Sequence, residues 1–229
     1  MQEPIIELKN VSKKYDNQYV LRDINLSITP DKIIGIVGAN GLGKSTLLDL
    51  IGNLIKPTSG EIQRFHTQIS YVPSSYEFET WMKIQDALKF YRTYYNNFDE
   101  SKAVRLIADS DLLLSDKIAN LSMGQQKRLC LILSISQNAD LYLMDEPFSG
   151  LDPYFKKNIR QFLLSNIPAH ASILMATHLL REMEQLFDEI IFFSPSGVSM
   201  MAADEIRQTY NKSIEEFYLE VVRYGKIKY

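Results

Sequence analysis

The first 37 residues contain three short stretches in which apolar and polar positions alternate. They cover residues 5–8, 20–28 and 33–37, and polar turns at Asp16-Asn17 and Pro30-Asp31 separate them. Alternation with a period of two is typical of strands that bury one face, and the turn residues favour reversals of the chain. We therefore expect an N-terminal antiparallel β subdomain.

The pattern changes after Lys44, where helical periodicity alternates with short apolar runs rich in branched side chains. Runs this short and this apolar are typical of buried parallel strands. Strands that alternate with helices form a parallel sheet with right-handed crossovers. The sequence thus predicts an α/β fold with a mostly parallel sheet, built on the runs at residues 69–72, 141–144, 173–176 and 190–193.

The middle of the chain is unusually aromatic. Apolar side chains recur at helical spacing from Ile84 to Tyr95, and residues 100–108 form a second helical pattern, so we predict a helical subdomain at about residues 76–135. The aromatic side chains form either a small local core, which is the simpler interpretation, or a docking surface for a partner helix. Few basic residues are interleaved with them, which argues against stacking on nucleic acid. The aromatic residues of this segment are Tyr76, Phe78, Trp81, Phe90, Tyr91, Tyr94, Tyr95 and Phe98.

Residues 38–45 have the sequence Gly-Ala-Asn-Gly-Leu-Gly-Lys-Ser, which fits a phosphate-binding loop at every fixed position. A predicted strand precedes this loop and a predicted helix follows it, as the motif requires. Glycines let successive N–H groups point at one phosphate, and the helix N-terminus adds its positive dipole end. Lys44 can bridge the β- and γ-phosphates, and the Ser45 hydroxyl can bind Mg²⁺. The predicted nucleotide-binding residues of the loop are Gly38, Asn40, Gly41, Gly43, Lys44, Ser45 and Thr46.

Two adjacent acids, Asp145 and Glu146, follow the apolar run at residues 141–144. A phosphate-binding loop needs a carboxylate at the end of another buried strand, and Asp145 is placed to hold Mg²⁺ through its water shell. Glu146 can point at the γ-phosphate and polarise a water molecule for in-line attack. The alternative is a turn that caps a helix before Pro147, and the intact loop favours the catalytic interpretation.

A further motif, Leu121-Ser122-Met123-Gly124-Gln125-Gln126, precedes an apolar helical pattern at residues 129–135. Ser122 is a predicted helix N-cap, behind which free backbone donors make a second anion site. The acidic strand comes next, followed by Ser149-Gly150-Leu151-Asp152 and then His178. These five motifs in this order resemble the nucleotide-binding subunits of ABC transporters, over about residues 5–200. The resemblance implies the phosphate-loop NTPase fold, with the helical subdomain carrying the signature motif, and hydrolysis of ATP with Mg²⁺.

The resemblance also implies individual roles within one subunit. Tyr15, in Lys-Lys-Tyr-Asp, matches the aromatic residue that stacks on adenine. Glu146 matches the catalytic base, and His178 matches the switch histidine that touches the γ-phosphate. A single histidine is more often a core or surface residue, so only its place in the ordered set makes His178 a candidate.

Other roles implied by the resemblance involve two subunits. Ser122, Gly124 and Gln125 would close over the ATP that another subunit holds, and Asp152 would communicate between the two sites. Two ATP molecules would be sandwiched head to tail in a homodimer, or in a heterodimer with a second ABC ATPase domain. An isolated chain would then be a poor ATPase.

The sequence departs from the family pattern at two positions. Met123 replaces the usual glycine of the signature motif, and we expect little loss because Ser122 and Gly124 remain. Ser74 stands where a glutamine usually binds Mg²⁺ and couples to the membrane subunit. The shorter hydroxyl would reach the metal through water, or Glu77 would substitute for it. The predicted metal ligands are therefore Ser45, Asp145 and Ser74.

Composition limits the kinds of partner. The chain has 229 residues and a net charge of −3, with a pI of about 5.7, so nucleic acid is not expected. The single cysteine, Cys130, fits a reducing compartment. No secretory signal is visible, and no stretch approaches the ~20 apolar residues of a spanning helix. The family resemblance then implies a separate membrane permease, with this chain cytoplasmic and peripheral on the inner face of the membrane.

We expect residues 1–229 to form a single ABC ATPase domain that powers transport. The alternative is a soluble ABC ATPase acting on ribosomes or DNA, but such relatives generally carry two motif sets, a long coiled coil or basic extensions. Three features resemble export-type subunits slightly more than import-type ones. They are the short interval between the phosphate-binding loop and the signature motif, the sequence from Gln125 to Leu129, and the lack of an added C-terminal domain. Residues 213–223 form a predicted amphipathic helix that packs on the domain or on its twin.

Overall fold

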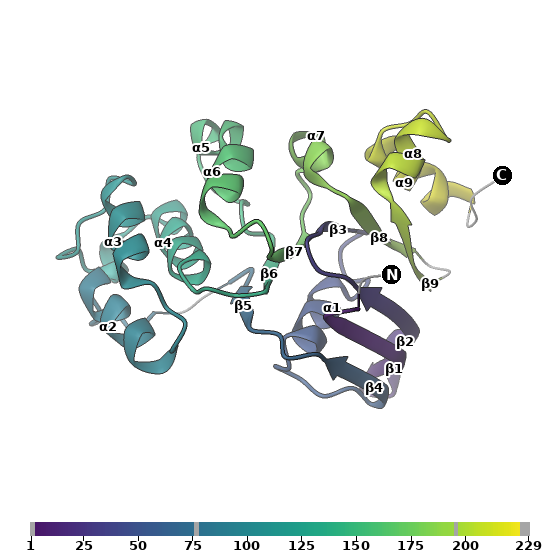
Figure 1. Cartoon of the computed structure of the whole chain (residues 1–229), viewed down its shortest axis with the longest axis horizontal. Coiled ribbons are helices and arrows are strands. Elements are labelled where there is room, and N and C mark those ends of the chain that lie inside the picture. The colour runs from purple at the N-terminus through teal and green to yellow at the C-terminus, as the bar shows by residue number, and fades with distance from the viewer. Residues whose placement is uncertain (1–2, 76–77, 195–196, 225–229) are drawn as a thin grey trace.

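The computed structural model describes residues 3–75, 78–194 and 197–224 (Figure 1). Its strands are β1 (Ile6–Tyr15), β2 (Gln18–Ile28), β3 (Ile33–Val37), β4 (Ser59–Arg64), β5 (Ile69–Val72), β6 (Leu141–Asp145), β7 (Ser172–Ala176), β8 (Glu189–Ser194) and β9 (Gly197–Ala202). Its α-helices are α1 (Lys44–Ile51), α2 (Ile84–Tyr94), α3 (Glu100–Ala108), α4 (Met123–Ile135), α5 (Pro153–Lys157), α6 (Ile159–Asn166), α7 (Leu180–Met183), α8 (Ala203–Gln208) and α9 (Ile214–Tyr224). Two short 3₁₀ helices are η1 (Ile118–Asn120) and η2 (Glu184–Leu186).

The N-terminal strands form a small antiparallel sheet in the order β2-β1-β4. Ile6 of β1 pairs with Ile28 of β2 on one side and with Arg64 of β4 on the other. The expected antiparallel subdomain is therefore confirmed. Its third strand, β4, was not predicted, because its sequence Ser-Gly-Glu-Ile-Gln-Arg has one apolar residue and none of its side chains is fully buried.

The larger sheet has the order β5-β6-β7-β3-β8-β9. Its first five strands run parallel, and β9 pairs with β8 in the antiparallel direction. All residues of β6 and β7 are buried, as continuous apolar runs predict. The prediction of a mostly parallel sheet is confirmed, and the antiparallel edge strand β9 was not foreseen.

Apolar side chains form two cores on opposite faces of the large sheet. One core joins the small sheet and α1 to the large sheet through residues such as Leu8, Leu47 and Leu143. The other contains Leu131 of α4, Leu163 of α6 and Phe217 of α9. This sandwich fixes the loop between β3 and α1 against the ends of β6 and β7. The site described below lies at that junction.

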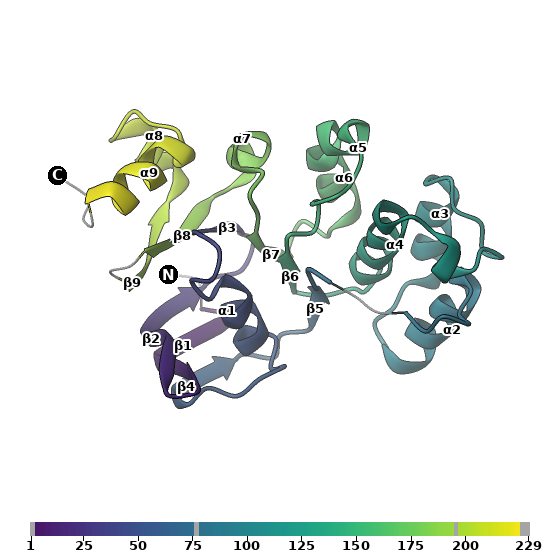
Figure 2. The same ribbon diagram turned by 180° about the vertical axis from the view of Figure 1, so that it is seen from behind.

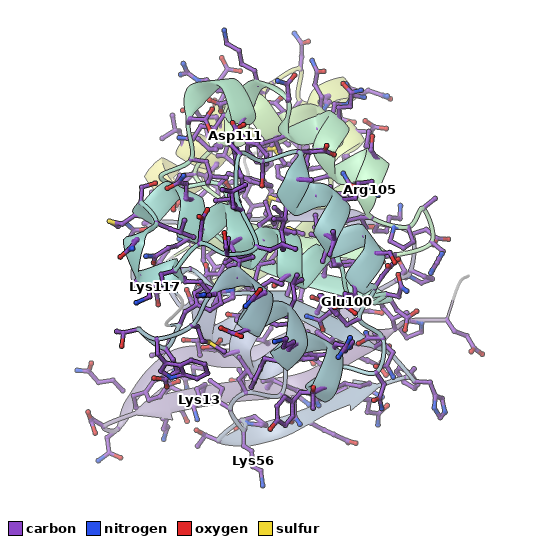
Figure 3. All side chains as sticks on the ribbon, turned by 90° about the vertical axis from the view of Figure 1, so that its left-hand side faces the viewer. Lys13, Lys56, Glu100, Arg105, Asp111 and Lys117 are labelled. Atoms are coloured by element: carbon purple, nitrogen blue, oxygen red, sulfur yellow. The ribbon has the colours of Figure 1, made fainter. Side chains whose placement is uncertain are left out.

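Helices α2, α3 and α4 lie together at one end of the molecule, away from the small sheet (Figures 1 and 2). Seen from that end, Glu100, Arg105, Asp111 and Lys117 lie over the helices, and Lys13 and Lys56 lie beside the small sheet (Figure 3). The helices expected from residue 84 and at residues 100–108 are both present. Among the described residues, no helix combines the length and the apolar composition needed to cross a membrane.

The aromatic residues of the helical end divide between the two interpretations. Phe78, Tyr91 and Phe98 pack against the buried core, as a local core predicts. Trp81 and Tyr94 are 64% and 68% exposed, and Phe90 and Tyr95 are also exposed, so half of the group lies on the surface. Tyr76 lies outside the described residues.

Candidate ATP-binding and hydrolysis site

The loop between β3 and α1 has a backbone that only glycine accommodates at two positions. A Cβ on Gly38 would lie 2.6 Å from the Cβ of Phe193 in β8, so the loop approaches the sheet too closely for a side chain. Gly43 has a φ of +99°, and a Cβ there would lie 2.8 Å from the Cγ1 of Val20. These constraints turn the loop back over the start of α1.

Lys44 is the first residue of α1, and its side chain curls under the loop. Its Nζ donates hydrogen bonds to the carbonyl oxygens of Gly38 at 2.7 Å and Ala39 at 3.1 Å. Burial lowers the pKa of Lys44, while the charges of Glu146 and Asp145 raise it. The ammonium group is thus hydrogen-bonded to the loop itself. An anionic phosphate would compete with the two neutral carbonyl oxygens as its acceptor.

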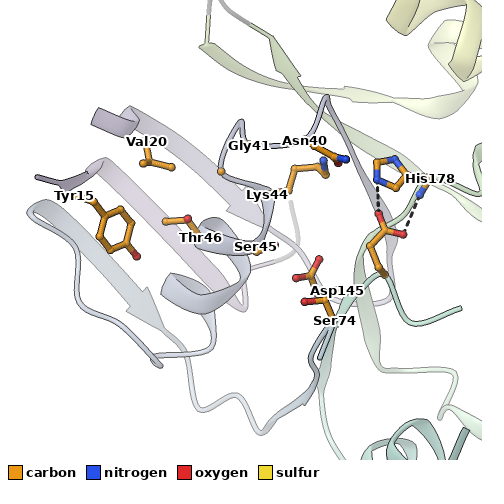
Figure 4. A pocket seen from close by; sticks show the side chains of 12 residues that line it. Tyr15, Val20, Asn40, Gly41, Lys44, Ser45, Thr46, Ser74, Asp145 and His178 are labelled. Atoms are coloured by element: carbon orange, nitrogen blue, oxygen red, sulfur yellow. Dashed lines mark hydrogen bonds and ion pairs between the residues drawn. The ribbon is translucent and has the colours of Figure 1, made fainter. Parts of the chain in front are cut away.

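A cavity of about 500 Å³ opens above this loop (Figure 4). The N-terminus of α1 borders it, and the first N–H groups of a helix have no partners within the helix. Figure 4 shows Tyr15 and Val20 at one end and His178 at the other. The cavity is lined by Tyr15, Val20, Asn40, Gly41, Gly43, Lys44, Ser45, Thr46, Ser74, Asp145, Glu146 and His178. Of the loop positions predicted to bind nucleotide, only Gly38 is absent from the lining, and it contributes through its carbonyl.

The acid pair enters the cavity from the end of β6. Asp145 is the last residue of this strand and is buried. Glu146 follows with a φ of +47°, a left-handed backbone that a side chain rarely adopts, and its N–H donates to the Ala176 carbonyl at 2.8 Å. The strained residue is therefore fixed to the neighbouring strand β7, and its side chain turns into the cavity.

The Glu146 carboxylate contacts His178 through both oxygens (Figure 4). Oε1 lies 3.2 Å from the His178 Nε2, and the backbone N–H of His178 donates to Oε2 at 3.3 Å. Burial raises the pKa of Glu146, and the His178 charge and N–H lower it. A carboxylate with a raised pKa is suited to take a proton from water.

The residues predicted to bind a metal line the same cavity, and all offer oxygen. Ser45 and Ser74 contribute hydroxyl groups and Asp145 contributes a carboxylate. Hard oxygen donors beside a phosphate site fit Mg²⁺. Glu77, the predicted substitute for Ser74, lies outside the described residues.

The signature motif lies at a different place on the chain. Ser122 caps α4 by accepting a hydrogen bond from the Gln125 N–H at 3.2 Å, and the Gln125 side chain accepts one from the Ser122 N–H at 2.9 Å. Ser122, Gly124, Gln125 and Asp152 line a second cavity of about 370 Å³. This cavity shares no lining residue with the first one. The phosphate-binding loop and the signature motif therefore line separate cavities on this chain.

Two residues that line the cavities, Val20 and Arg128, were not predicted as site residues from the sequence. Val20 lies on β2 opposite Gly43 and offers an apolar surface beside Tyr15 (Figure 4). Arg128 joins the second cavity and donates to the Asp152 carboxylate at 2.7 Å. Neither had a usable signal, because an isolated valine in a strand and an arginine in a helix have no motif of their own.

Comparisons with known proteins identify the family. Residues 21–149 match the family described as ABC transporter. The chain is 31% identical over 223 residues to the ABC transporter ATP-binding protein YtrB of Bacillus subtilis, with 91% of this chain and 75% of that protein covered. It is also 31% identical over 194 residues to the zinc import ATP-binding protein ZnuC of Rickettsia conorii, with 83% of each chain covered.

The structural comparison agrees with the sequence comparison. A solved structure of the ATP binding subunit of an ABC transporter superposes with a TM-score of 0.84 and 25% sequence identity, covering 95% of this chain and 99% of that one. The fold is accordingly the α/β phosphate-loop fold that the motifs implied. The chain belongs to the ABC transporter family, as an ATP-binding subunit that hydrolyses ATP.

Proposed function

We propose that this ATPase works as half of a head-to-tail pair of ABC domains, each of which completes the other's nucleotide site. The observation that carries the proposal is the separation of the two cavities on one chain. The phosphate loop and acid pair line one cavity, and Ser122 and Gly124 line the other, with no residue in common. A helix N-terminus capped by Ser122 offers phosphate-binding N–H groups that the chain does not direct at its own loop.

In the proposed mechanism, ATP binds along the first cavity. Its adenine stacks on Tyr15, and Val20 covers the neighbouring apolar surface. The phosphates lie on the loop N–H groups and the N-terminus of α1, and Lys44 leaves its two carbonyl partners for the β- and γ-phosphates. The loop and Lys44 would thus bind the β- and γ-phosphates, between which the reacting bond lies.

Hydrolysis requires a water molecule between Glu146 and the γ-phosphate. Its oxygen attacks the phosphorus in line, Glu146 accepts the water proton, and the bond from phosphorus to the β,γ-bridging oxygen breaks. ADP and inorganic phosphate are the products. His178 holds the carboxylate at two points and orients it before attack. Ser45, Asp145 and Ser74 would hold Mg²⁺, which would supply neutralisation of the charge on the β- and γ-phosphates.

We further propose that residues 1–229 act as one ABC ATPase domain, with about residues 76–135 as its helical subdomain. A separate membrane permease would bind this domain, which would then be peripheral on the cytoplasmic face. The exposed aromatic side chains of the helical end, Trp81, Phe90, Tyr94 and Tyr95, support a protein contact there. The slight preference for export has no support among the relatives described above, one of which is a zinc import protein, so import is the direction to test first.

The permease can be identified by capture from native membranes. Tagged Glu146→Gln protein, held with ATP, is used to isolate partners from detergent-solubilised membranes, and Lys44→Ala protein is the matched control. A stoichiometric polytopic membrane protein that depends on intact Lys44 supports the proposal. Ribosomal proteins or nucleic acid in its place would favour the soluble alternative, which none of the comparisons supports.

A further inference from the structure

A buried lysine lies behind the acid pair, in a place that the nucleotide cavity does not include. Lys127 is on α4, five residues after the N-cap Ser122, and only 7% of its surface is exposed. It lines a separate cavity of about 310 Å³ together with Ser74 and Ser149. Burying an ammonium group costs free energy, so the position needs a compensating partner.

The partner of Lys127 is the turn that carries Glu146. The Lys127 Nζ donates to the Ser149 hydroxyl at 2.5 Å. That hydroxyl donates to the Glu146 carbonyl at 3.3 Å, and the Ser149 N–H donates to the same carbonyl at 3.3 Å. The three groups form a chain from α4 to the backbone of the residue with the strained φ of +47°.

Two further contacts hold α4 against the same segment. Gly124 lies so close to it that a Cβ would be 3.1 Å from the Gly150 carbonyl oxygen, and Arg128 pairs with Asp152. These contacts reach residues 150–152, and of the three only Lys127 reaches the turn at Glu146. The first turns of α4 therefore lie against both ends of the loop that follows β6.

The charge of Lys127 also suits its surroundings. Burial lowers the pKa of Lys127, and the charges of Glu146, Cys130 and Asp145 raise it, so the ammonium group lies within the field of the acid pair. Lys44 faces that pair from the nucleotide side. Two lysines thus interact with the charges of the acid pair, Lys44 from the nucleotide cavity and Lys127 from a separate cavity.

We propose that Lys127 is a positioning residue for ATP hydrolysis, which acts through Ser149 to hold the Glu146 turn in register with the signature helix. The proposal rests on the role of Glu146 as the base. Because Ser122 is the N-cap of α4, a shift of the signature motif on closure would move the Glu146 carboxylate through Lys127. Neither Lys127 nor Ser149 contacts the nucleotide cavity in its own chain.

The test compares variants of the full chain in steady-state ATP hydrolysis. Lys127→Met keeps the long side chain and removes the charge and the hydrogen bond, and Ser149→Ala removes only the link. We expect each to lower kcat about tenfold, because a misplacement of a catalytic group by about 1 Å can cost roughly 100-fold and the loss of one hydrogen bond should shift Glu146 by less. KM for ATP should stay within about twofold, since loop and helix N-terminus are unchanged.

The controls separate positioning from folding. The kcat of the double variant should be no lower than that of the less active single variant, because both changes break the same chain of contacts. Lys127→Arg should recover most of the activity, and Lys56→Met, at an exposed lysine beside the small sheet, should behave as wild type. Melting temperatures are measured for every variant, and Ser149→Ala provides the test if Lys127→Met does not fold.

Two results would overturn the proposal. One is an unchanged kcat in Lys127→Met and Ser149→Ala, and the other is an equal loss of ATP binding and kcat that follows the melting temperature. Glu146→Gln is measured alongside to separate this proposal from the one on which it rests. If Glu146→Gln hydrolyses ATP normally, the base has been wrongly assigned; if it is inactive while Lys127→Met is fully active, only the positioning role fails.

Discussion

Lys44 shows how a single residue prepares the site for its ligand. Its ammonium group is buried and bound by two carbonyl oxygens of its own loop, so the cation is in place before any nucleotide arrives. A phosphate oxygen carries more negative charge than a carbonyl and accepts a stronger hydrogen bond. We therefore expect a bound nucleotide to draw the Lys44 ammonium group away from these two carbonyl oxygens.

Replacement of Lys44 should remove binding and activity together. Lys44→Ala deletes a charged donor to the phosphates, worth about 1.5–3 kcal/mol, so we expect affinity for ATP to fall roughly 10- to 100-fold. Isothermal titration with a non-hydrolysable ATP analogue measures the loss, and a thermal melt checks the fold. Unchanged affinity would show that the loop binds nucleotide without its lysine.

Ser74 allows a test of the unusual metal position. Ser74→Gln places the family's amide at an exposed position in the cavity lining. We expect ATP binding to stay intact and turnover to change less than about tenfold, because Lys44, Ser45 and Asp145 are unchanged. Turnover and nucleotide affinity are measured across a Mg²⁺ titration. A complete loss of Mg²⁺-dependent binding would contradict the assignment of this position.

At the scale of elements, α4 combines two environments along one helix. Its N-terminus carries the signature motif at the surface, with Met123 87% exposed, and its later residues are buried from Leu129 to Ile135. A helix anchored so firmly at one end can transmit a displacement of the other. Cys130 lies in the anchored part and reports on it.

The Cys130 thiol should be inert while α4 is packed. Burial raises the pKa of Cys130 to about 12, and alkylation requires the thiolate. At pH 8 we expect iodoacetamide to modify the native protein more than about 100-fold more slowly than the protein in denaturant. Mass spectrometry measures the two rates. Rapid modification of the native protein would mean that this part of the helix opens readily.

The sequence predicts those elements whose own residues contain their pattern. The strands β6 and β7 are continuous apolar runs, and the phosphate-binding loop is a fixed motif between a strand and a helix, so all three were predicted. Strands β4 and β9 were not predicted. Strand β4 is polar, and β9 is an edge strand in which no side chain is fully buried, so neither has a clear apolar pattern. Short helices such as α5 and α7 have too few turns to show a period.

The same distinction applies to the candidate site. Motif residues of the loop and the acid pair were named from sequence and lie around one cavity. The resemblance to ABC transporter subunits also predicted Tyr15 and His178, and both line this cavity. Distances such as the 3.2 Å between His178 and Glu146, and the contact of Lys127 with Ser149, depend on packing between β6, β7 and α4, which no local pattern encodes.

At the scale of the whole molecule, the ATPase chain presents two separate cavities. The residues that we propose to hold and hydrolyse ATP lie at the junction of the two sheets, and the signature motif lies on the helical end. A second ABC domain turned by half a revolution would place each signature motif over the other phosphate loop. Closure would then be driven by the difference in ATP affinity between the separated and the paired states.

The central claim is tested most directly by the mass of the Glu146→Gln protein in solution. Removal of the base should stop hydrolysis and preserve ATP binding, so the variant should elute with ATP and Mg²⁺ as a dimer of twice the chain mass by light scattering. The wild-type protein, which hydrolyses its ATP, should remain largely monomeric. An ATP-loaded Glu146→Gln protein that stays monomeric at high concentration would contradict the head-to-tail arrangement.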